Sequence, residues 1–124
     1  LMLAAMRANL AEVMTESAYA RMAELAGQLA AGLREVIARR GVPWCVTQVG
    51  ARTEIQFAAS APRNGSEAGA ILDGEVEHLL HLFLANRGVL ITPFHNMMLV
   101  CPHTTAADVA RLVSLLDDGL AQIV

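Results

Sequence analysis

The most informative absence in this sequence is lysine. The chain has 124 residues, and all 9 of its Lys+Arg positions are arginines. Enzymes that form a Schiff base with a carbonyl compound use the amine of a lysine side chain. Because this chain has no lysine, it cannot complete such chemistry with its own residues.

Aromatic residues and positive charge are also scarce. Phe, Trp and Tyr make up 4% of the chain, and its net charge at pH 7 is -3. Single-stranded nucleic acids bind to aromatic side chains on which bases stack, and phosphate backbones bind to basic surfaces. The sequence also has no apolar run of the roughly 18 residues that a membrane span requires. We therefore expect neither a nucleic-acid partner nor a membrane.

Cysteine is the third scarce residue type. Cys45 and Cys101 are too few for a disulfide framework, so we expect buried free thiols in a reducing cytoplasm. Apolar residues are abundant instead, at 55% of the chain against 17% charged. A chain of this length can bury one core. The sequence therefore predicts a single domain over residues 1–124, with some apolar surface left for a partner.

Apolar residues recur at the spacing of an amphipathic helix in much of the chain. The predicted helices cover residues 1–14, 16–40, 73–86 and 105 to the end. Thr15 and Thr105 have the hydroxyl that commonly caps a helix N-terminus, and Asp108 is placed to complete a capping box. Gly41 followed by Pro43 predicts the end of the second helix, and Gly88 suits the left-handed residue that often ends a helix.

The remaining apolar segments are short and predict strands over residues 44–49, 52–58, 89–92 and 97–100, with a loop over 60–69. In the second strand, dry positions alternate with polar ones: Thr53, Ile55 and Phe57 against Arg52, Glu54 and Gln56. This alternation is typical of an antiparallel strand with one wet face. We expect an α+β fold in which a small antiparallel or mixed sheet of about four strands has helices packed on one face and follows a long helix.

Polar side chains that could contact a ligand lie at two places. The loop between the last two predicted strands contains Phe94, His95 and Asn96, and loops set on rigid strands often carry functional groups. A turn that satisfies its own backbone is the competing explanation. Arg52 projects from the wet face of its strand, where it could bind a carboxylate as a guanidinium fork or form a solvated ion pair with Glu54.

Two histidines raise the question of a metal site. His78 and His81 are spaced i, i+3 on one predicted helix. A metal site needs three or four converging ligands, and the neighbouring Leu82 and Phe83 supply none. The sequence therefore favours two ordinary surface histidines over a metal site.

Several segments occur in an order and at a spacing that resemble a known family. They are MRANLAEVM (6–14), RRG (39–41), VTQVGARTEIQF (46–57), NRGVLITPFHNMMLV (86–100) and TTAADVARLV (104–113). Together they resemble the C-terminal small domain of class III aminotransferases, which are fold type I enzymes that use pyridoxal phosphate. The most similar members are those like glutamate-1-semialdehyde aminomutase.

The resemblance implies that the chain is a fragment of an enzyme that moves an amino group between an amino acid and a keto acid. The lysine that attaches the cofactor would lie in a large domain of the same polypeptide, so the fragment alone would be inactive. Residues 1–40 would form a helical linker and a packing helix, the small domain would act as a lid over the substrate, and the parent would be a homodimer. No residue of this chain would be catalytic, and the implied substrate-binding residues are Arg52, Phe94, His95 and Asn96.

Two departures from the family pattern bear on the substrate. Met98 stands where many class III transaminases have an arginine that binds the carboxylate of 2-oxoglutarate, and the loop lacks the acidic residue that the aminomutases proper carry there. A small or β-amino acid substrate, with Arg52 as the carboxylate fork, is the resulting expectation. The alternative to an enzyme segment is a stand-alone α+β interaction or dimerisation domain that uses its apolar surface and has no catalytic function.

Overall fold

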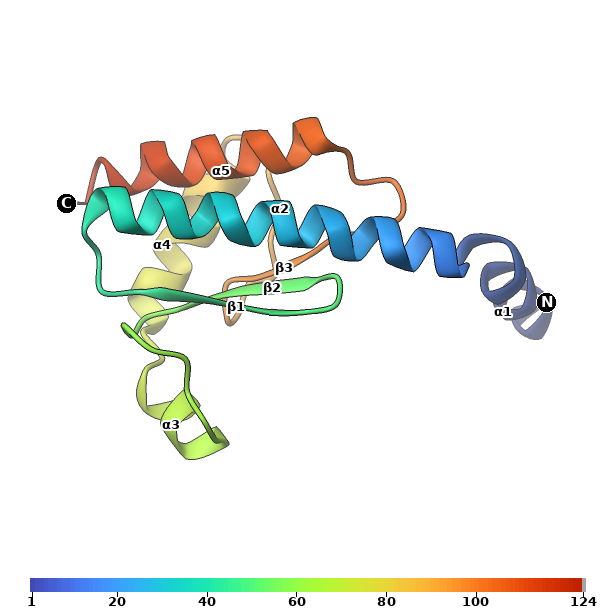
Figure 1. The fold of residues 1–124 in the computed structure, drawn as a ribbon, viewed down its shortest axis with the longest axis horizontal. Coiled ribbons are helices and arrows are strands. Elements are labelled where there is room, and N and C mark those ends of the chain that lie inside the picture. The colour runs from blue at the N-terminus through green and yellow to red at the C-terminus, as the bar shows by residue number, and fades with distance from the viewer. Residues whose placement is uncertain (124) are drawn as a thin grey trace.

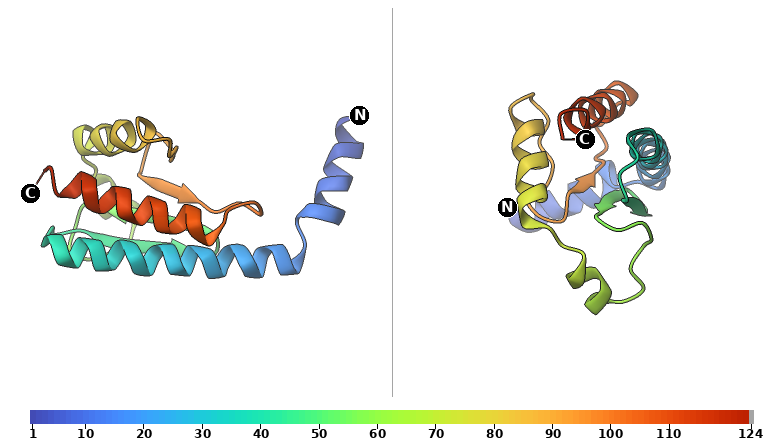
Figure 2. Two further views of the ribbon diagram at one scale, coloured as in Figure 1. Left: turned by 90° about the horizontal axis from the view of Figure 1, so that it is seen from above. Right: turned by 90° about the vertical axis from the view of Figure 1, so that its left-hand side faces the viewer.

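The computed structural model describes residues 1–123 and has an α+β architecture (Figure 1). In chain order the elements are α1 (Met2–Ala8), the π-helical turn η1 (Asn9–Val13), α2 (Glu16–Arg40), β1 (Cys45–Val49), β2 (Arg52–Gln56), α3 (Gly65–Ala70), α4 (Gly74–Ala85), β3 (Met97–Leu99) and α5 (Ala106–Leu120). The long helix α2 lies along the sheet with α5 beside it, and α4 packs against α5 (Figure 2). The predicted fold class is confirmed.

Helix α2 is the central element because it contacts both α5 and the sheet. It begins and ends at the predicted residues. The Thr15 hydroxyl accepts a hydrogen bond from the Ala18 N–H at 3.2 Å, and Gly41 adopts the left-handed φ of 68°. The face that α2 buries is apolar throughout: Met22, Leu25, Ala26, Leu29, Ala30, Leu33, Val36 and Ile37.

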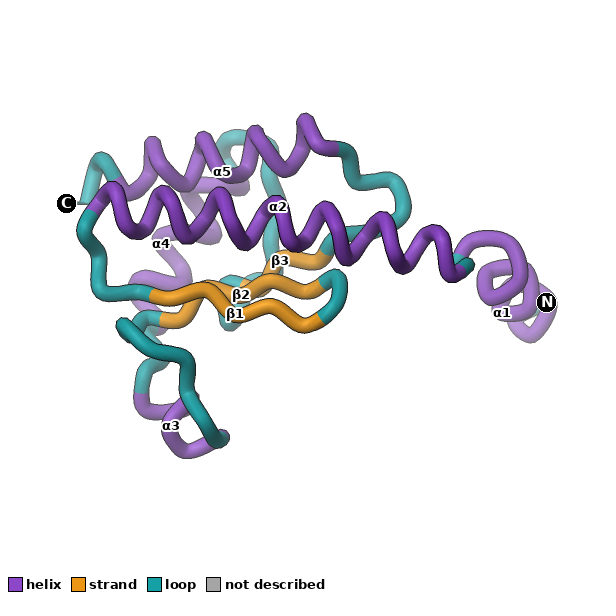
Figure 3. The backbone as a smooth tube through the Cα atoms, in the orientation of Figure 1, coloured by secondary structure: helices purple, strands orange, loops and turns teal. Residues whose placement is uncertain are grey.

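The sheet has three antiparallel strands in the order β1-β2-β3 (Figure 3). Its register pairs Val46 with Ile55 and Thr53 with Met98. These four side chains are buried on the face that α2 covers, where the Thr53 hydroxyl donates to the Ala26 carbonyl at 3.3 Å. Because side chains alternate along a strand, the intervening residues lie on the opposite side, which we call the open face.

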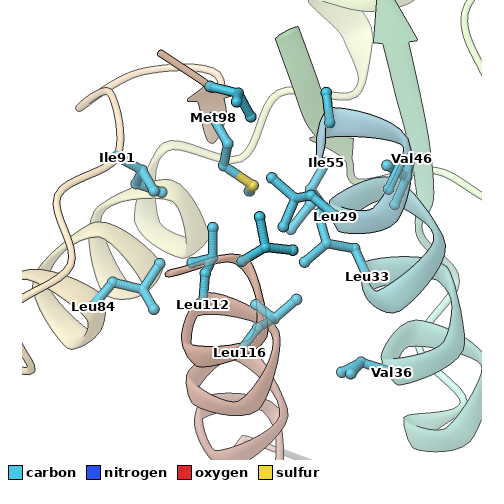
Figure 4. Packing of buried hydrophobic residues seen from close by; sticks show 14 of the residues in the cluster. Leu29, Leu33, Val36, Val46, Ile55, Leu84, Ile91, Met98, Leu112 and Leu116 are labelled. Carbon is cyan, nitrogen blue, oxygen red and sulfur yellow. The ribbon is translucent and has the colours of Figure 1, made fainter. Parts of the chain in front are cut away.

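One hydrophobic core lies between α2, α4, α5 and the inner face of the sheet (Figure 4). Leu29 and Leu33 of α2 lie close to Leu112 and Leu116 of α5, and the Met98 side chain points toward the same centre. Helices thus cover one face of the sheet and seal it from water, as predicted from the sequence.

The predicted boundaries of α4 are confirmed to within one residue, and so is the predicted start of α5, although α5 ends at Leu120 before the end of the chain. The Thr105 hydroxyl accepts the Asp108 N–H at 3.2 Å, while the Asp108 carboxylate accepts the Thr105 N–H at 2.8 Å, which completes the capping box. Helix α4 follows the Asp73 cap, and after its end Gly88 takes the left-handed φ of 77°.

The predicted fourth strand, residues 89–92, is wrong. The segment leaves α4 through a hydrogen bond from the Val89 N–H to the Leu84 carbonyl, and it then meets β3 through one from the Thr92 N–H to the Met97 carbonyl at 3.1 Å. A strand ladder needs successive bonds of this kind. The chain turns sharply just before β3, which has only 3 residues, so there is no length over which a ladder could continue.

The predicted helix over residues 1–14 forms, but its hydrogen-bond pattern changes part-way. It begins as α1, widens into η1 and ends at Met14, which leaves the helical region. The segment projects away from the body, and residues 1–13 are all exposed (Figures 1 and 2). Within the described part of the chain its apolar side chains have no covering surface: Leu3, Met6, Leu10 and Val13.

The predicted loop over residues 60–69 contains the short helix α3. The Asn64 side chain caps it by accepting the Glu67 N–H at 3.0 Å, and Arg63 forms an ion pair with Glu67 at 3.0 Å. A helix of 6 residues is too short to show an apolar period, and its Ser and Gly content favours a loop prediction. In Figure 1 this helix lies on the side of the sheet opposite to α2 and α5.

Candidate functional site

A hollow lies on the open face of the sheet, beside β2, α3 and the turn that precedes β3. Its volume is about 410 Å³, and it is lined by Arg52, Glu54, Gln56, Gly65, Ala68, Gly69, Leu72 and His95. We call it the open-face hollow. Two of the predicted substrate-binding residues, Arg52 and His95, therefore lie in one place although they are distant in sequence.

The polar wall of the hollow comes from β2. Arg52, Glu54 and Gln56 face the same way because alternate residues of a strand share a face, as the period-two pattern predicted. Arg52 and Glu54 form an ion pair at 2.5 Å, with side-chain exposures of 49% and 12%. The guanidinium thus has a carboxylate partner within the chain, and a ligand carboxylate would have to share it with Glu54 or displace Glu54.

The turn before β3 brings His95 to the hollow. The Thr92 hydroxyl lies 2.8 Å from the Phe94 carbonyl oxygen, and it accepts the Met97 N–H at 3.2 Å. Between these anchors His95 and Asn96 take left-handed φ values of 60° and 41°. For residues other than glycine this conformation costs on the order of 1 kcal/mol each, and Asn and His adopt it more readily than most. Backbone strain held by such contacts is a reason to examine a turn for function.

The other two predicted residues of this turn do not line the open-face hollow. Phe94 is exposed, and its ring lies edge-to-face against His95 with the centroids 5.6 Å apart. Asn96 is only 2% exposed, and among the described residues its Nδ2 has no hydrogen-bond partner. The structure therefore joins Arg52 with His95, places Phe94 next to them and buries Asn96.

Glu54 and Gln56 are lining residues that were not among the predicted binding residues. Glu54 is half-buried and holds Arg52, while Gln56 is 9% exposed. The signal that could have identified both is the alternation along β2, since every second residue from Arg52 onward shares its face.

Neither cysteine adds a nucleophile to the hollow. Cys45 pairs with Gln56 in the register of the sheet, and burial raises the pKa of its thiol although the Arg34 charge opposes this. A thiol with a raised pKa stays protonated at neutral pH and reacts slowly. Cys101 lies after β3 outside the hollow, where a hydrogen bond from the Thr104 hydroxyl lowers its pKa. Cys101 is exposed, so the predicted burial is wrong for this thiol.

The histidines of α4 lie apart from the hollow. The His78 Nδ1 is 3.0 Å from the Gly74 carbonyl oxygen, and His81 has a buried Nδ1 beside the apolar segment around Ile91. Within residues 1–123, no group of three or more His, Cys, Asp or Glu side chains could hold a metal ion. The metal-site hypothesis therefore gains no support from the structure.

Met98 faces the core. It is 4% exposed, it pairs with Thr53 on the inner face, and its side chain points toward Leu112 (Figure 4). The positions of β3 on the open face are Met97 and Leu99, opposite Glu54 and Arg52. A side chain at position 98 therefore cannot reach the open-face hollow in this register.

Similar solved structures decide to which family this arrangement belongs. A glutamate-1-semialdehyde-aminomutase from Pseudomonas aeruginosa PAO1, in one structure in complex with PMP, has 54% identity over 98% of this chain with a TM-score of 0.95. By sequence and structure, the chain is a segment of the class III aminotransferase family. The family resemblance of the sequence is thereby confirmed.

More distant members of the family share the fold. A beta-phenylalanine aminotransferase from Variovorax paradoxus has 26% identity over 93% of this chain with a TM-score of 0.82. An omega-transaminase from Sphaerobacter thermophilus has 25% identity over 87% with a TM-score of 0.71. The chain spans about a quarter of the length of these neighbours, at 27%, 26% and 25%.

Other comparisons found no match. No protein-family model matches the chain, and no curated protein does.

Among residues 1–123 no helix is both long enough and apolar enough to cross a membrane.

Proposed function

We propose that the parent protein is a pyridoxal-phosphate-dependent aminotransferase or aminomutase, and that residues 1–124 form its small, substrate-side domain. The observation that carries the proposal is the 54% identity to an aminomutase in complex with PMP, which extends over 98% of the chain. In this function the parent moves an amino group between an amino acid and a keto acid. The same observation favours an enzyme segment over a stand-alone interaction domain.

The cofactor is held outside this chain. Its covalent attachment needs a lysine, and none of the 124 residues is a lysine. When bound, pyridoxal phosphate supplies the electron sink for amino-group chemistry. The residues of this chain act on the substrate instead, and the chain alone is inactive. Treating the purified chain with pyridoxal phosphate and borohydride should label only its N-terminal amine, and a label on any other residue would contradict this.

The partner of this domain is a large cofactor-binding domain of the same polypeptide. Support comes from the exposed apolar stripe of residues 1–13, which reaches away from the body of the chain. A contiguous exposed apolar surface of this kind marks an interface. Residues 1–40 act as a linker and a packing helix between the two domains. The parent is a homodimer. Its free thiols are compatible with the cytoplasm.

Arg52 binds the carboxylate of the substrate. Its guanidinium lies half-exposed at the open-face hollow, and a planar guanidinium binds a carboxylate through two parallel hydrogen bonds. Glu54 keeps Arg52 in place before the substrate arrives. His95 provides a polar group on the opposite wall, and Phe94 supplies an apolar wall next to it.

The acceptor and the donor are small or β-amino acids and their keto acids. A transaminase that uses 2-oxoglutarate through an arginine of β3 is not supported, since position 98 is a buried methionine. Asn96, which the resemblance also implies in binding, would act by supporting the turn of His95, because its own side chain is buried.

Kinetics of Arg52 variants in the full-length enzyme test this function. Hydrogen bonds to charged groups contribute about 1.5–3 kcal/mol, so Arg52→Met should raise KM for carboxylate-bearing amino acids about 10- to 100-fold. Amines without a carboxylate should react as before, and Arg52→Lys should restore only part of the loss because it lacks the fork.

Arg63→Met is the matched control. Arg63 also has an ion pair with a glutamate, but it lies outside β2 and does not line the open-face hollow. Unchanged KM values in Arg52→Met, or equal increases of KM in both variants, would contradict the role of Arg52 in binding the substrate carboxylate.

A further inference from the structure

The open face of the sheet becomes more exposed from one end to the other. The register of the strands divides this face into three rows: Cys45 and Gln56; Thr47, Glu54 and Met97; and Val49, Arg52 and Leu99. The first row is buried or half-buried, whereas Val49 is 79% exposed and Leu99 is 63% exposed in the last. In Figure 1, α3 lies beneath the first row, and the turn that joins β1 to β2 extends beyond it. We call Val49, Arg52 and Leu99 the end row.

The end row is too apolar for a sheet face that stays in water. On such a face the outward strand positions are typically polar, yet two of the three end-row residues are a valine and a leucine. Leu90, which is 82% exposed, lines a second hollow of about 510 Å³ together with Leu99, Pro93 and Met97. Single exposed apolar residues are common, but a contiguous group of them marks an interface.

Arg52 lies in the middle of this apolar surface, and its proposed role requires cover. Its side chain is 49% exposed, and an ion pair in contact with water contributes little to binding. The same hydrogen bonds become stronger where water is excluded. A substrate carboxylate is therefore held firmly at Arg52 only if another surface shields the end row from water.

The size of the substrate indicates which surface this is. The carboxylate and the amino group of an amino acid are only a few ångströms apart, and the amino group must reach a cofactor that this lysine-free chain does not attach. The domain that holds the cofactor must therefore approach Arg52 closely. Val49 and Leu99 flank Arg52 across the sheet, with Cβ atoms about 4.5–5.5 Å away, so the same approach covers both.

The length of the related enzymes is consistent with such a domain. The chain covers 27% of the aminomutase with which it shares 54% identity, so most of that neighbour has no counterpart in this chain.

We propose that the large domain of the same polypeptide docks on the end row and Leu90, and that this contact seals the Arg52 end of the open-face hollow from water. Val49, Leu90 and Leu99 pack against apolar side chains of the large domain, while Arg52 remains free to bind the substrate carboxylate. The end row is thus a docking surface in addition to the exposed stripe of residues 1–13. This inference rests on the proposed function, because it takes the cofactor to be held by a large domain of the parent.

Thiol labelling of the full-length protein tests the contact. Cys45 and Cys101 would first be replaced by alanine, and a single cysteine would then be introduced as Leu99→Cys, Val49→Cys or Leu82→Cys. The rate of maleimide labelling at the introduced cysteine is measured by peptide mass spectrometry, in the native protein and in urea.

Leu82→Cys is the matched control. Leu82 is 56% exposed, nearly as much as Leu99 at 63%, and it lies on α4 away from the end row. If nothing covered the end row, the two positions would be labelled at similar rates. Val49→Cys repeats the test on the other side of Arg52.

The docking contact should slow labelling at the end row. We expect Leu99→Cys and Val49→Cys to react about ten-fold or more slowly than Leu82→Cys, because their labelling requires transient opening of the contact. In urea the three should react alike, and the native protection should not depend on protein concentration. Equal native rates at all three positions would overturn the proposal. So would protection that is lost on dilution, because it would show that a second copy of the chain covers the end row.

Labelling needs no turnover, so this inference and the proposed function can fail separately. Protection of the end row in a protein that transfers no amino group would support the docking surface and contradict the proposed function. Amino-group transfer by a protein in which Leu99→Cys and Val49→Cys react as fast as Leu82→Cys would overturn the docking surface and leave the proposed function standing.

Discussion

Replacing Met98 by arginine tests the register of the sheet, on which the whole open face depends. Met98 pairs with Thr53 and is 4% exposed in the core. The family resemblance of the sequence implies an arginine at this position in many class III transaminases, which makes arginine the informative substitution. In this register, however, the guanidinium would enter the core and could not reach the hollow.

The expected loss follows from placing a charge in the core. An unpaired charge left in a core costs about 3–5 kcal/mol, and the extra bulk of arginine in a packed core adds about 1–3 kcal/mol. Together these costs are comparable to the whole stability of a typical domain, which is about 5–15 kcal/mol. Met98→Arg should therefore leave the chain largely unfolded at 25 °C.

Urea unfolding of the purified chain, followed by circular dichroism, measures this effect. Leu99→Arg is the control, because Leu99 is 63% exposed on the open face opposite Arg52, and it should change stability by no more than about 0.5 kcal/mol. A stable Met98→Arg and an unstable Leu99→Arg would refute the reasoning, since a slip of one residue moves every side chain to the other face.

Two further predictions concern the contact of α2 with α5. Hydrogen bonding from Arg40 lowers the pKa of Asp117 in the folded chain. The ion pair therefore contributes stability above the pKa of an ordinary carboxyl group, and this contribution is lost as pH falls through the lower pKa of folded Asp117. Asp117→Asn should lower the melting temperature at pH 7, and the difference from wild type should shrink below about pH 4; a constant difference would contradict it. Gly32→Ala should cost about 1 kcal/mol in urea unfolding, because its Cβ would lie 2.8 Å from the Val113 Cγ2, whereas the open Gly27→Ala should be neutral or stabilising. Equal effects of the two alanines would contradict the close approach.

The long helices could be predicted from the sequence because two independent signals agree in each. In α2 the apolar period selects the buried face, and Thr15 and Gly41 fix the ends. In α5 the period is accompanied by the capping box at Thr105. Residues 89–92 offer only one signal, and there the prediction fails: they are apolar like a strand, but pairing depends on β3, which the turn cuts short.

The site was predictable in part for the same reason. The alternation of β2 placed Arg52 on the correct face, and the unusual turn sequence drew attention to His95. That the two share one hollow depends on the register of β2 with β3, which no local pattern encodes. The burial of Asn96 and Gln56 depends on the left-handed turn and on the position of α3, and both are tertiary features.

The most direct test of the central claim is amino-group transfer by the full-length polypeptide. The purified protein with pyridoxal phosphate would be incubated with ¹⁵N-labelled α- or β-amino acids and an unlabelled keto acid, and the products analysed by mass spectrometry. We predict that the label appears on the keto-acid carbon, or at a new carbon of the donor if the enzyme is an aminomutase, and only when the cofactor is present. A polypeptide that binds pyridoxal phosphate but moves the label for no donor, or moves it equally without the cofactor, would contradict the account.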